Sequence, residues 1–138
     1  MSWYELYYHF VWSTKYRAPT IDGAWEAELY KVIVAKCKAL DSWVYAIGGV
    51  QDHVHLIASV SPTIPIATFT NQVKGNSSHF VNHVIQPTNT FAWQPDYSVL
   101  SFHRKHLSIM VQYVRNQKEH HSSGNLYKGL EPNDPPPT

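Results

Sequence analysis

The sequence has few of the features that mark secreted or membrane proteins. It contains one cysteine, Cys37, which excludes an internal disulfide bond. It has no apolar run of about 18 residues, the length that a transmembrane helix needs. Its first residues, MSWYELYYHF, lack the basic start and apolar core of a secretory signal. We therefore expect a cytoplasmic protein with no membrane partner.

Charge is also scarce, because charged residues make up 15% of the chain and the net charge is only +1. The first 52 residues are near neutral, with five basic and six acidic side chains. Residues 53–118 contain one acidic residue, Asp96, against five basic residues: Lys74, Arg104, Lys105, Arg115 and Lys118. A basic second half can bind phosphate groups, although a solvated helix face explains the same pattern equally well.

Hydrophobic and aromatic residues are abundant, at 43% and 14% of the 138 residues. This length and composition predict one folded domain with a sizeable core. We expect the domain to span residues 1–121. Gly, Pro and Asn dominate after that point and the chain ends near PPP, so residues 122–138 are predicted to form a flexible C-terminal tail.

The pattern of apolar residues predicts strands at 3–12, 43–50, 54–60 and 97–102. Helices are expected at 22–40, where Asp22 can cap the first turn, at 66–85 and at 103–121. A loop should join the first strand and helix over residues 14–20. The order β-α-β-β-α-β followed by a last helix indicates an α+β fold with a ferredoxin-like antiparallel sheet flanked by helices.

The third predicted strand carries two histidines on one face. Side chains alternate along a strand, so Val54, Leu56, Ala58 and Val60 should face the core. His53 and His55 then point together to the other face, where both imidazoles can reach one divalent ion. A pair of surface histidines is the alternative, because the chain has nine histidines.

The last predicted helix carries a tyrosine and a glutamine one turn apart. Its buried stripe should be Leu107, Met110, Val111 and Val114, and Tyr113 lies roughly 110° from the centre of that stripe. Gln117 shares the face of Tyr113, and His106 and His120 flank it. A phenol beside a neutral amide can serve a metal–phosphate site, whereas a boundary tyrosine that packs its ring is the structural alternative.

Four segments together resemble the single-tyrosine transposases of small bacterial insertion sequences, including REP-associated tyrosine transposases, within the HUH endonuclease superfamily. The segments are YHFVWSTKYRAP (8–19), DHVHLI (52–57), KGNSS (74–78) and YVRNQKEHH (113–121). HUH stands for His, hydrophobic residue, His, which His53, Val54 and His55 match. The resemblance covers roughly residues 8–121 and depends on the combination of segments.

The resemblance implies a metal-dependent, site-specific nuclease and strand transferase that acts on single-stranded DNA. Tyr113 would attack a phosphate, form a 5′-phosphotyrosine link and release a 3′-hydroxyl, and a later 3′-hydroxyl would rejoin the strands. His53, His55 and Gln117 would bind Mg²⁺ or Mn²⁺. Relatives recognise DNA hairpins at element ends and work as homodimers with composite active sites. Candidate DNA contacts in the matched or basic segments are Lys15, Arg17, Lys74, Ser77, Ser78, Arg115 and Lys118.

Two other functions fit parts of the sequence. One is a domesticated or inactive relative that binds DNA hairpins without cutting them, although the chain retains all four expected site residues. The second is a histidine-triad nucleotide hydrolase, which needs a third alternating histidine. Position 57 is Ile57, so this function is set aside. No residue is identifiable as a general base for Tyr113, although His120 lies near it on the predicted helix.

Overall fold

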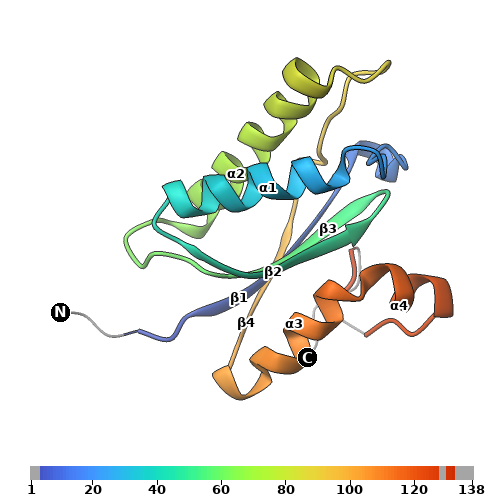
Figure 1. The fold of residues 1–138 in the computed structure, drawn as a ribbon. Helices are drawn as coiled ribbons and strands as arrows, with labels where there is room; N and C mark the ends of the chain where they lie inside the picture. Colours follow the sequence, from blue (N-terminus) through green and yellow to red (C-terminus); the bar gives the residue numbers. More distant parts are fainter. Residues whose placement is uncertain (1–3, 128–129, 133–138) are drawn as a thin grey trace.

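The computed structural model describes residues 4–127 and 130–132. Four strands form one antiparallel sheet: β1 (Tyr7–Ser13), β2 (Trp43–Val50), β3 (His53–Ser59) and β4 (Ser98–Phe102). Their order across the sheet is β2-β3-β1-β4, so β3 pairs with both β1 and β2 (Figure 1). This arrangement confirms the predicted α+β fold with a ferredoxin-like antiparallel sheet.

Helices cover both faces of the sheet (Figure 1). Helices α1 (Glu26–Ala39) and α2 (Ile66–Phe80) lie together on one face. Helices α3 (Leu107–Arg115) and α4 (Gln117–Ser123) lie on the other, against β2 and β3. In the described part of the chain, no helix is long and apolar enough to cross a membrane.

The alternation of side chains along β3 confirms the predicted core. Val54, Leu56 and Ala58 are fully buried in the large cluster that also contains residues of α1 and α2. Ile57 points the other way and packs with Val114 of α3. The second face of β3 is therefore buried as well, which places the side chains that share it, including His53 and His55, inside the protein.

Several element boundaries differ from the prediction. Helix α1 begins at Glu26, because the Asp22 carboxylate accepts a hydrogen bond from the Ala24 N–H in a preceding turn. The predicted helix 66–85 is α2 followed by a π-helical turn at Val81–Ile85. A short 3₁₀ turn, Lys15–Arg17, lies inside the predicted loop, and Tyr16 and Arg17 both have positive φ there.

The predicted helix 103–121 is interrupted. A 3₁₀ turn at Arg104–His106 leads into α3, and Asn116 separates α3 from α4 with φ −102° and ψ 28°. Tyr113 is therefore on α3, whereas Gln117 begins α4. The expectation of one continuous helix was wrong, because sequence periodicity does not detect a break of one residue.

Helix α3 can approach the sheet closely because position 48 has no side chain. A Cβ atom on Gly48 of β2 would overlap the backbone carbonyl oxygen of Val114. Neither backbone can move aside without displacing the helix that carries Tyr113. Gly48 thus fixes the distance between the sheet and the helix.

Gly48→Ala is expected to lower the free energy of unfolding by about 1–3 kcal/mol, the usual cost of overpacking. Urea denaturation followed by circular dichroism measures the change. Gly75→Ala is the matched control, because a Cβ at this α2 position meets no atom within 4 Å. It should stabilise the protein by about 0.5–1 kcal/mol. Equal effects of the two substitutions would contradict the close approach.

Candidate active site

His53 and His55 lie side by side under α3 and α4. Both side chains are completely buried, and their ring centroids are 5.0 Å apart. Their Nε2 atoms are buried and make no hydrogen bond to any described residue, although both lie at ion-pair distance from Glu131. Two buried imidazole nitrogens that face the same point are the ligand pair that a divalent cation needs.

The opposite nitrogen of each histidine has a specific partner. The Nδ1 atom of His53 is 2.7 Å from the Oδ1 atom of Asp52. The Nδ1 atom of His55 is 2.9 Å from the Nε2 atom of His9, which is 2% exposed on β1. When each Nδ1–H donates to its partner, each Nε2 keeps a lone pair for a cation. Asp52 and His9 therefore orient the two histidines as outer-shell groups do in metal sites.

Burial keeps the imidazoles of His55 and His9 neutral near pH 7. It lowers the pKa of His55 to about 4, with a smaller opposing effect of the Glu131 carboxylate. It also lowers the pKa of His9 to about 3, and the neighbouring His55 adds to the effect. Neutral imidazole is the form that binds metal, so neither histidine has to lose a proton first.

Tyr113 contacts this pair from α3. Its ring centroid is 5.9 Å from that of His55, and the two rings meet edge to face. The side chain is 1% exposed, so it is more deeply buried than the sequence indicated. Of the stripe expected to be buried, Val114 is buried, whereas Leu107, Met110 and Val111 are half-buried. Tyr113 is covered by later residues, because Tyr127 stacks on its ring at 4.1 Å.

Glu131 lies between the tyrosine and the histidines. One carboxylate oxygen, Oε2, accepts a short hydrogen bond from the Tyr113 hydroxyl. The other, Oε1, lies 3.2 Å, 3.5 Å and 2.8 Å from the Nε2 atoms of His53, His55 and His121. We call these four residues, His53, His55, His121 and Glu131, the His–Glu cluster. Each offers one ligand atom, and all four atoms lie within 4.8 Å of one another, so the cluster could hold a divalent metal.

The charges in the cluster change the acidity of two groups. Burial raises the pKa of the Tyr113 hydroxyl, and its hydrogen bond to the Glu131 carboxylate raises it further. Burial also raises the pKa of Glu131, but the neighbouring His53 and His55 side chains outweigh this effect, so the pKa is below its usual range. Glu131 is therefore a carboxylate and Tyr113 a neutral phenol in this arrangement.

Gln117 is close to the cluster but does not belong to it. Its side chain is 1% exposed, and its Oε1 atom is 3.1 Å from the Nε2 atom of His121. Its amide N–H donates to the Tyr113 carbonyl oxygen at 3.3 Å. The Glu131 carboxylate contacts His53 and His55 directly, and the ring centroid of His121 is 4.8 Å from that of His53. The role of Gln117 as a metal ligand remains a proposal.

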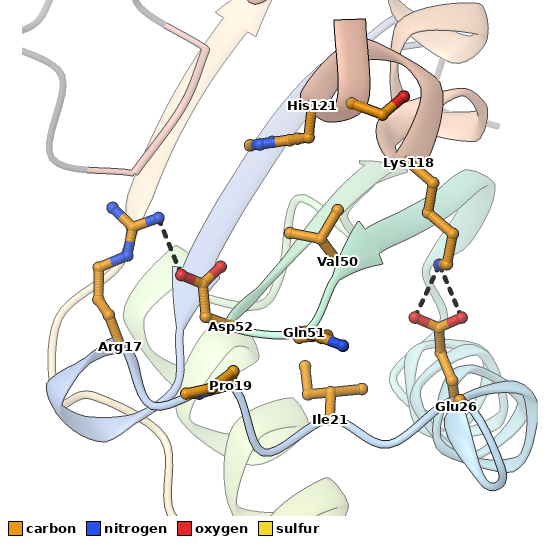
Figure 2. A pocket seen from close by; sticks show the side chains of 11 residues that line it. Arg17, Pro19, Ile21, Glu26, Val50, Gln51, Asp52, Lys118 and His121 are labelled. Atoms are coloured by element: carbon orange, nitrogen blue, oxygen red, sulfur yellow. Dashed lines mark hydrogen bonds and ion pairs between the residues drawn. The ribbon is translucent and has the colours of Figure 1, made fainter. Parts of the chain in front are cut away.

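Two of the predicted DNA-contact residues line a pocket beside the cluster. The pocket has a volume of about 610 Å³, and Arg17, Lys118, Asp52 and His121 are among its lining residues (Figure 2). Arg17 pairs with Asp52 at 3.2 Å, and Lys118 pairs with Glu26 at 2.7 Å. The cations are 38% and 66% exposed, their carboxylate partners are less exposed, and Lys118 also donates to the Gly49 carbonyl oxygen at 3.1 Å.

Three other predicted contacts lie away from the cluster on α2. Lys74 is 7% exposed and donates to the carbonyl oxygens of residues 94, 95 and 96. Ser77 is fully buried, donates to the Lys74 carbonyl and accepts from the Trp93 indole. Ser78 is half-buried and donates to the Gly75 carbonyl. Lys74 and Ser77 thus hold the loop before β4, and we do not propose DNA contacts for them or for Ser78.

Four residues of the site were missed in the sequence. Asp52 lies in the DHVHLI motif, between two predicted strands, and His121 follows Gln117 by four residues, a spacing that shares a helix face. His9 lies in the first predicted strand. Side chains alternate along a strand, so His9 is on the face opposite to Phe10 and Trp12, and this pattern was the available signal. Glu131 gives no local signal, because it lies in a stretch rich in Gly, Asn and Pro with no periodicity.

His9→Phe tests the orienting role of the second histidine. The ring volume is kept, but the Nδ1–H of His55 loses its acceptor, so the affinity for Mn²⁺ is expected to fall about 10–100-fold. Isothermal titration of the DNA-free protein measures this affinity. His83→Phe, at an exposed position after α2, is the control and should leave it unchanged. An unaltered affinity in His9→Phe would exclude the orienting role.

The chain was compared with known proteins. Residues 2–117 match the sequence profile of the family described as "Transposase IS200 like". The ISDra2 transposase TnpA of Deinococcus radiodurans is 27% identical over 123 residues, which cover 84% of this chain and 86% of that protein.

Two solved structures have a similar fold. A crystal structure assigned to a transposase of Deinococcus radiodurans has a TM-score of 0.66 and 27% identity, and covers 84% of this chain and 93% of that one. A REP-associated tyrosine transposase bound to a REP hairpin has a TM-score of 0.64 and 15% identity, covering 91% and 76%. The second likeness concerns the fold alone. The profile match spans most of the chain, and the chain therefore belongs to the IS200-like transposases, the single-tyrosine family of the HUH superfamily.

Proposed function

We propose that this transposase cleaves and rejoins single-stranded DNA with Tyr113 as its nucleophile. The observation that carries the proposal is the meeting of Tyr113 with His55 in one buried site, at a ring separation of 5.9 Å. Among the tyrosines that the structure describes, Tyr113 is the one whose hydroxyl donates a hydrogen bond to a residue of the His–Glu cluster, Glu131. The eight other tyrosines of the sequence need no role in the chemistry.

The covalent step has a simple balance. The phenolic oxygen of Tyr113 attacks phosphorus, a bond forms between them, and the bond from phosphorus to the 3′ oxygen breaks. The hydroxyl proton of Tyr113 passes to solvent, and the leaving 3′ oxygen takes one up. The phosphodiester is conserved as a 5′-phosphotyrosine, so a 3′-hydroxyl can reverse the reaction on another strand without an external energy source.

The residues present fit a divalent cation, Mg²⁺ or Mn²⁺. The two buried Nε2 atoms of His53 and His55 face the same point, and the partners of their Nδ1 atoms, Asp52 and His9, can accept the proton of the tautomer that metal binding needs. When bound, the cation would supply a positive charge that polarises a phosphate oxygen. Gln117 is proposed as a further ligand, since its buried amide oxygen lies one hydrogen bond away, at His121.

A DNA hairpin is the proposed substrate. The REP-associated transposase of similar fold was solved with a REP hairpin, which supports this proposal by analogy. We propose that Arg17 and Lys118 contact the backbone of the strand that enters the pocket, together with the exposed Lys15 and Arg115. A homodimer is proposed as the assembly, although Tyr113 and the histidines already meet within one chain.

A hairpin-binding relative without cleavage is the second candidate. The burial of Tyr113 favours it, because a nucleophile with 1% exposure cannot meet DNA without a movement of the residues above it. The two candidates predict the same DNA binding and differ only in the covalent product.

The test is incubation of the protein with single-stranded oligonucleotides that contain hairpins from the flanking DNA, with Mn²⁺ or with EDTA. A band of protein joined to labelled DNA on a denaturing gel, present with Mn²⁺ and absent with EDTA, is the expected result. Hairpin binding in a gel shift without any such band would favour the second candidate.

A further inference from the structure

The residues after α4 return to the active site. Helix α4 ends at Gly124, whose φ of 75° turns the chain back. Tyr127 then stacks on Tyr113, and its backbone N–H donates to the Tyr113 hydroxyl oxygen at 3.1 Å. Glu131 follows, with only 7% of its surface exposed. We call residues 124–127 and 130–132 the C-terminal segment.

The carboxylate of Glu131 has the geometry of a metal ligand. Its Oε1 atom is 2.8–3.5 Å from the Nε2 atoms of His121, His53 and His55. Adjacent ligand atoms about 2.0–2.1 Å from an octahedral cation are about 3 Å from one another, so the observed spacing is close to that of a bound site. Three imidazoles and one carboxylate also form a ligand set of normal chemistry for a divalent ion.

The second oxygen of the same carboxylate engages the nucleophile. The Tyr113 hydroxyl donates to Oε2 of Glu131, so its proton points at an anion that the protein itself provides. A scissile phosphate would need the same two positions: one oxygen toward the histidines, and phosphorus in front of the tyrosine oxygen.

We propose that Glu131 is a displaceable metal ligand. In the DNA-free protein His121 and Glu131 hold the cation together with His53 and His55, and the phosphate of the DNA strand replaces Glu131 and frees Tyr113. The proposal rests on the function proposed above, and it adds two ligands and a resting state to it. Carboxylate and phosphate are both oxygen anions, so one can take the place of the other at a cation without leaving a charge unbalanced.

The proposal has two parts, that Glu131 binds the metal and that DNA displaces it. Glu131→Gln tests both, because glutamine keeps the shape of the side chain and removes its charge. The affinity for Mn²⁺ without DNA, measured by isothermal titration, is expected to fall about tenfold or more. The initial rate of covalent adduct formation at saturating Mn²⁺ is expected to rise about tenfold, since the internal competitor is weaker. Glu28→Gln, an exposed carboxylate on α1, is the control and should change neither quantity.

The other outcomes overturn the proposal. A loss of affinity with a slower reaction would mean that Glu131 takes part in the chemistry and is not displaced. An unchanged affinity would exclude it as a ligand. If no variant and no wild-type protein forms an adduct while the affinity still falls in Glu131→Gln, the proposed strand cleavage fails and the ligand role stands.

Tyr127→Ala provides a second measurement that leaves every ligand in place. It removes the ring that covers Tyr113, so the C-terminal segment should detach more readily and adduct formation should accelerate severalfold. Hydrogen exchange of the backbone amides of Tyr113 and Tyr127 should be faster in the same variant. Unchanged adduct formation together with faster exchange would show that the cover does not limit access to the nucleophile.

Discussion

Tyr113→Phe is expected to abolish the covalent protein–DNA product while hairpin binding stays within about twofold of wild type. The substitution removes one oxygen atom from a side chain whose ring remains packed between His55 and Tyr127. Loss of a nucleophile lowers the rate by a factor of about 10³ or more. The denaturing gel measures the adduct, and a gel shift with the same oligonucleotide measures binding.

Tyr8→Phe is the matched control for this experiment. Tyr8 is half-buried on β1 and packs against the cluster on the α1–α2 face of the sheet, away from the histidines. It should form the adduct at the wild-type rate. Persistence of the adduct in Tyr113→Phe would mean that another tyrosine attacks the DNA, and the assignment of the active site would then be wrong.

His55→Gln is expected to lower the affinity for Mn²⁺ by at least about 100-fold and to eliminate cleavage. Glutamine fills most of the space and offers an N–H to His9, so the buried position keeps a polar partner. The loss should therefore reflect the missing imidazole nitrogen and not unfolding. Titration of Mn²⁺ into the DNA-free variant and its circular dichroism spectrum provide the two measurements.

His53→Gln should behave in the same way, because its Nε2 atom faces the same point. His83→Gln, at the exposed position used above, should keep full affinity and full cleavage. Hairpin binding should be nearly unchanged in all three variants, since neither buried histidine is accessible to a hairpin stem. Cleavage in His55→Gln at ordinary Mn²⁺ concentrations would remove the histidine pair from the mechanism.

The sheet could be predicted because local sequence and tertiary environment agree along it. Val54, Leu56 and Ala58 alternate with His53 and His55, and this period of two determines which side chains share a face. The prediction that both histidines point together followed from this period alone. That the second face is also buried did not follow, because burial of that face depends on the position of α3 about 60 residues later.

The environment of Tyr113 could not be predicted for a similar reason. Its neighbours Tyr127 and Glu131 come from a stretch that reads as a tail, with Gly124 and Pro132 nearby and no apolar period. Contacts of this kind are made by single side chains and not by a helix or strand, so no periodic sequence pattern predicts them. The described part of that stretch contacts the site, and residues 133–138 of the predicted tail lie outside the described residues.

Lys74 has a structural role that its charge does not reveal in the sequence. A lysine in a basic region suggests a phosphate contact. In the structure, the Lys74 ammonium group donates to three successive carbonyl oxygens before β4. Burial lowers the pKa of this group, and Asp96 partly opposes the shift. The difference between the two roles depends on the path of a loop 20 residues away.

The break at Asn116 divides the residues of the proposed active site into two groups. His53 and His55 belong to the sheet, and Tyr113 belongs to a helix that is clamped against Gly48. Gln117, His121 and Glu131 all come after the break, on α4 and the residues that follow it. In the function proposed above, the group that would carry the phosphotyrosine is therefore held on one side of the break, and the residues proposed to leave the cation when DNA binds lie on the other side.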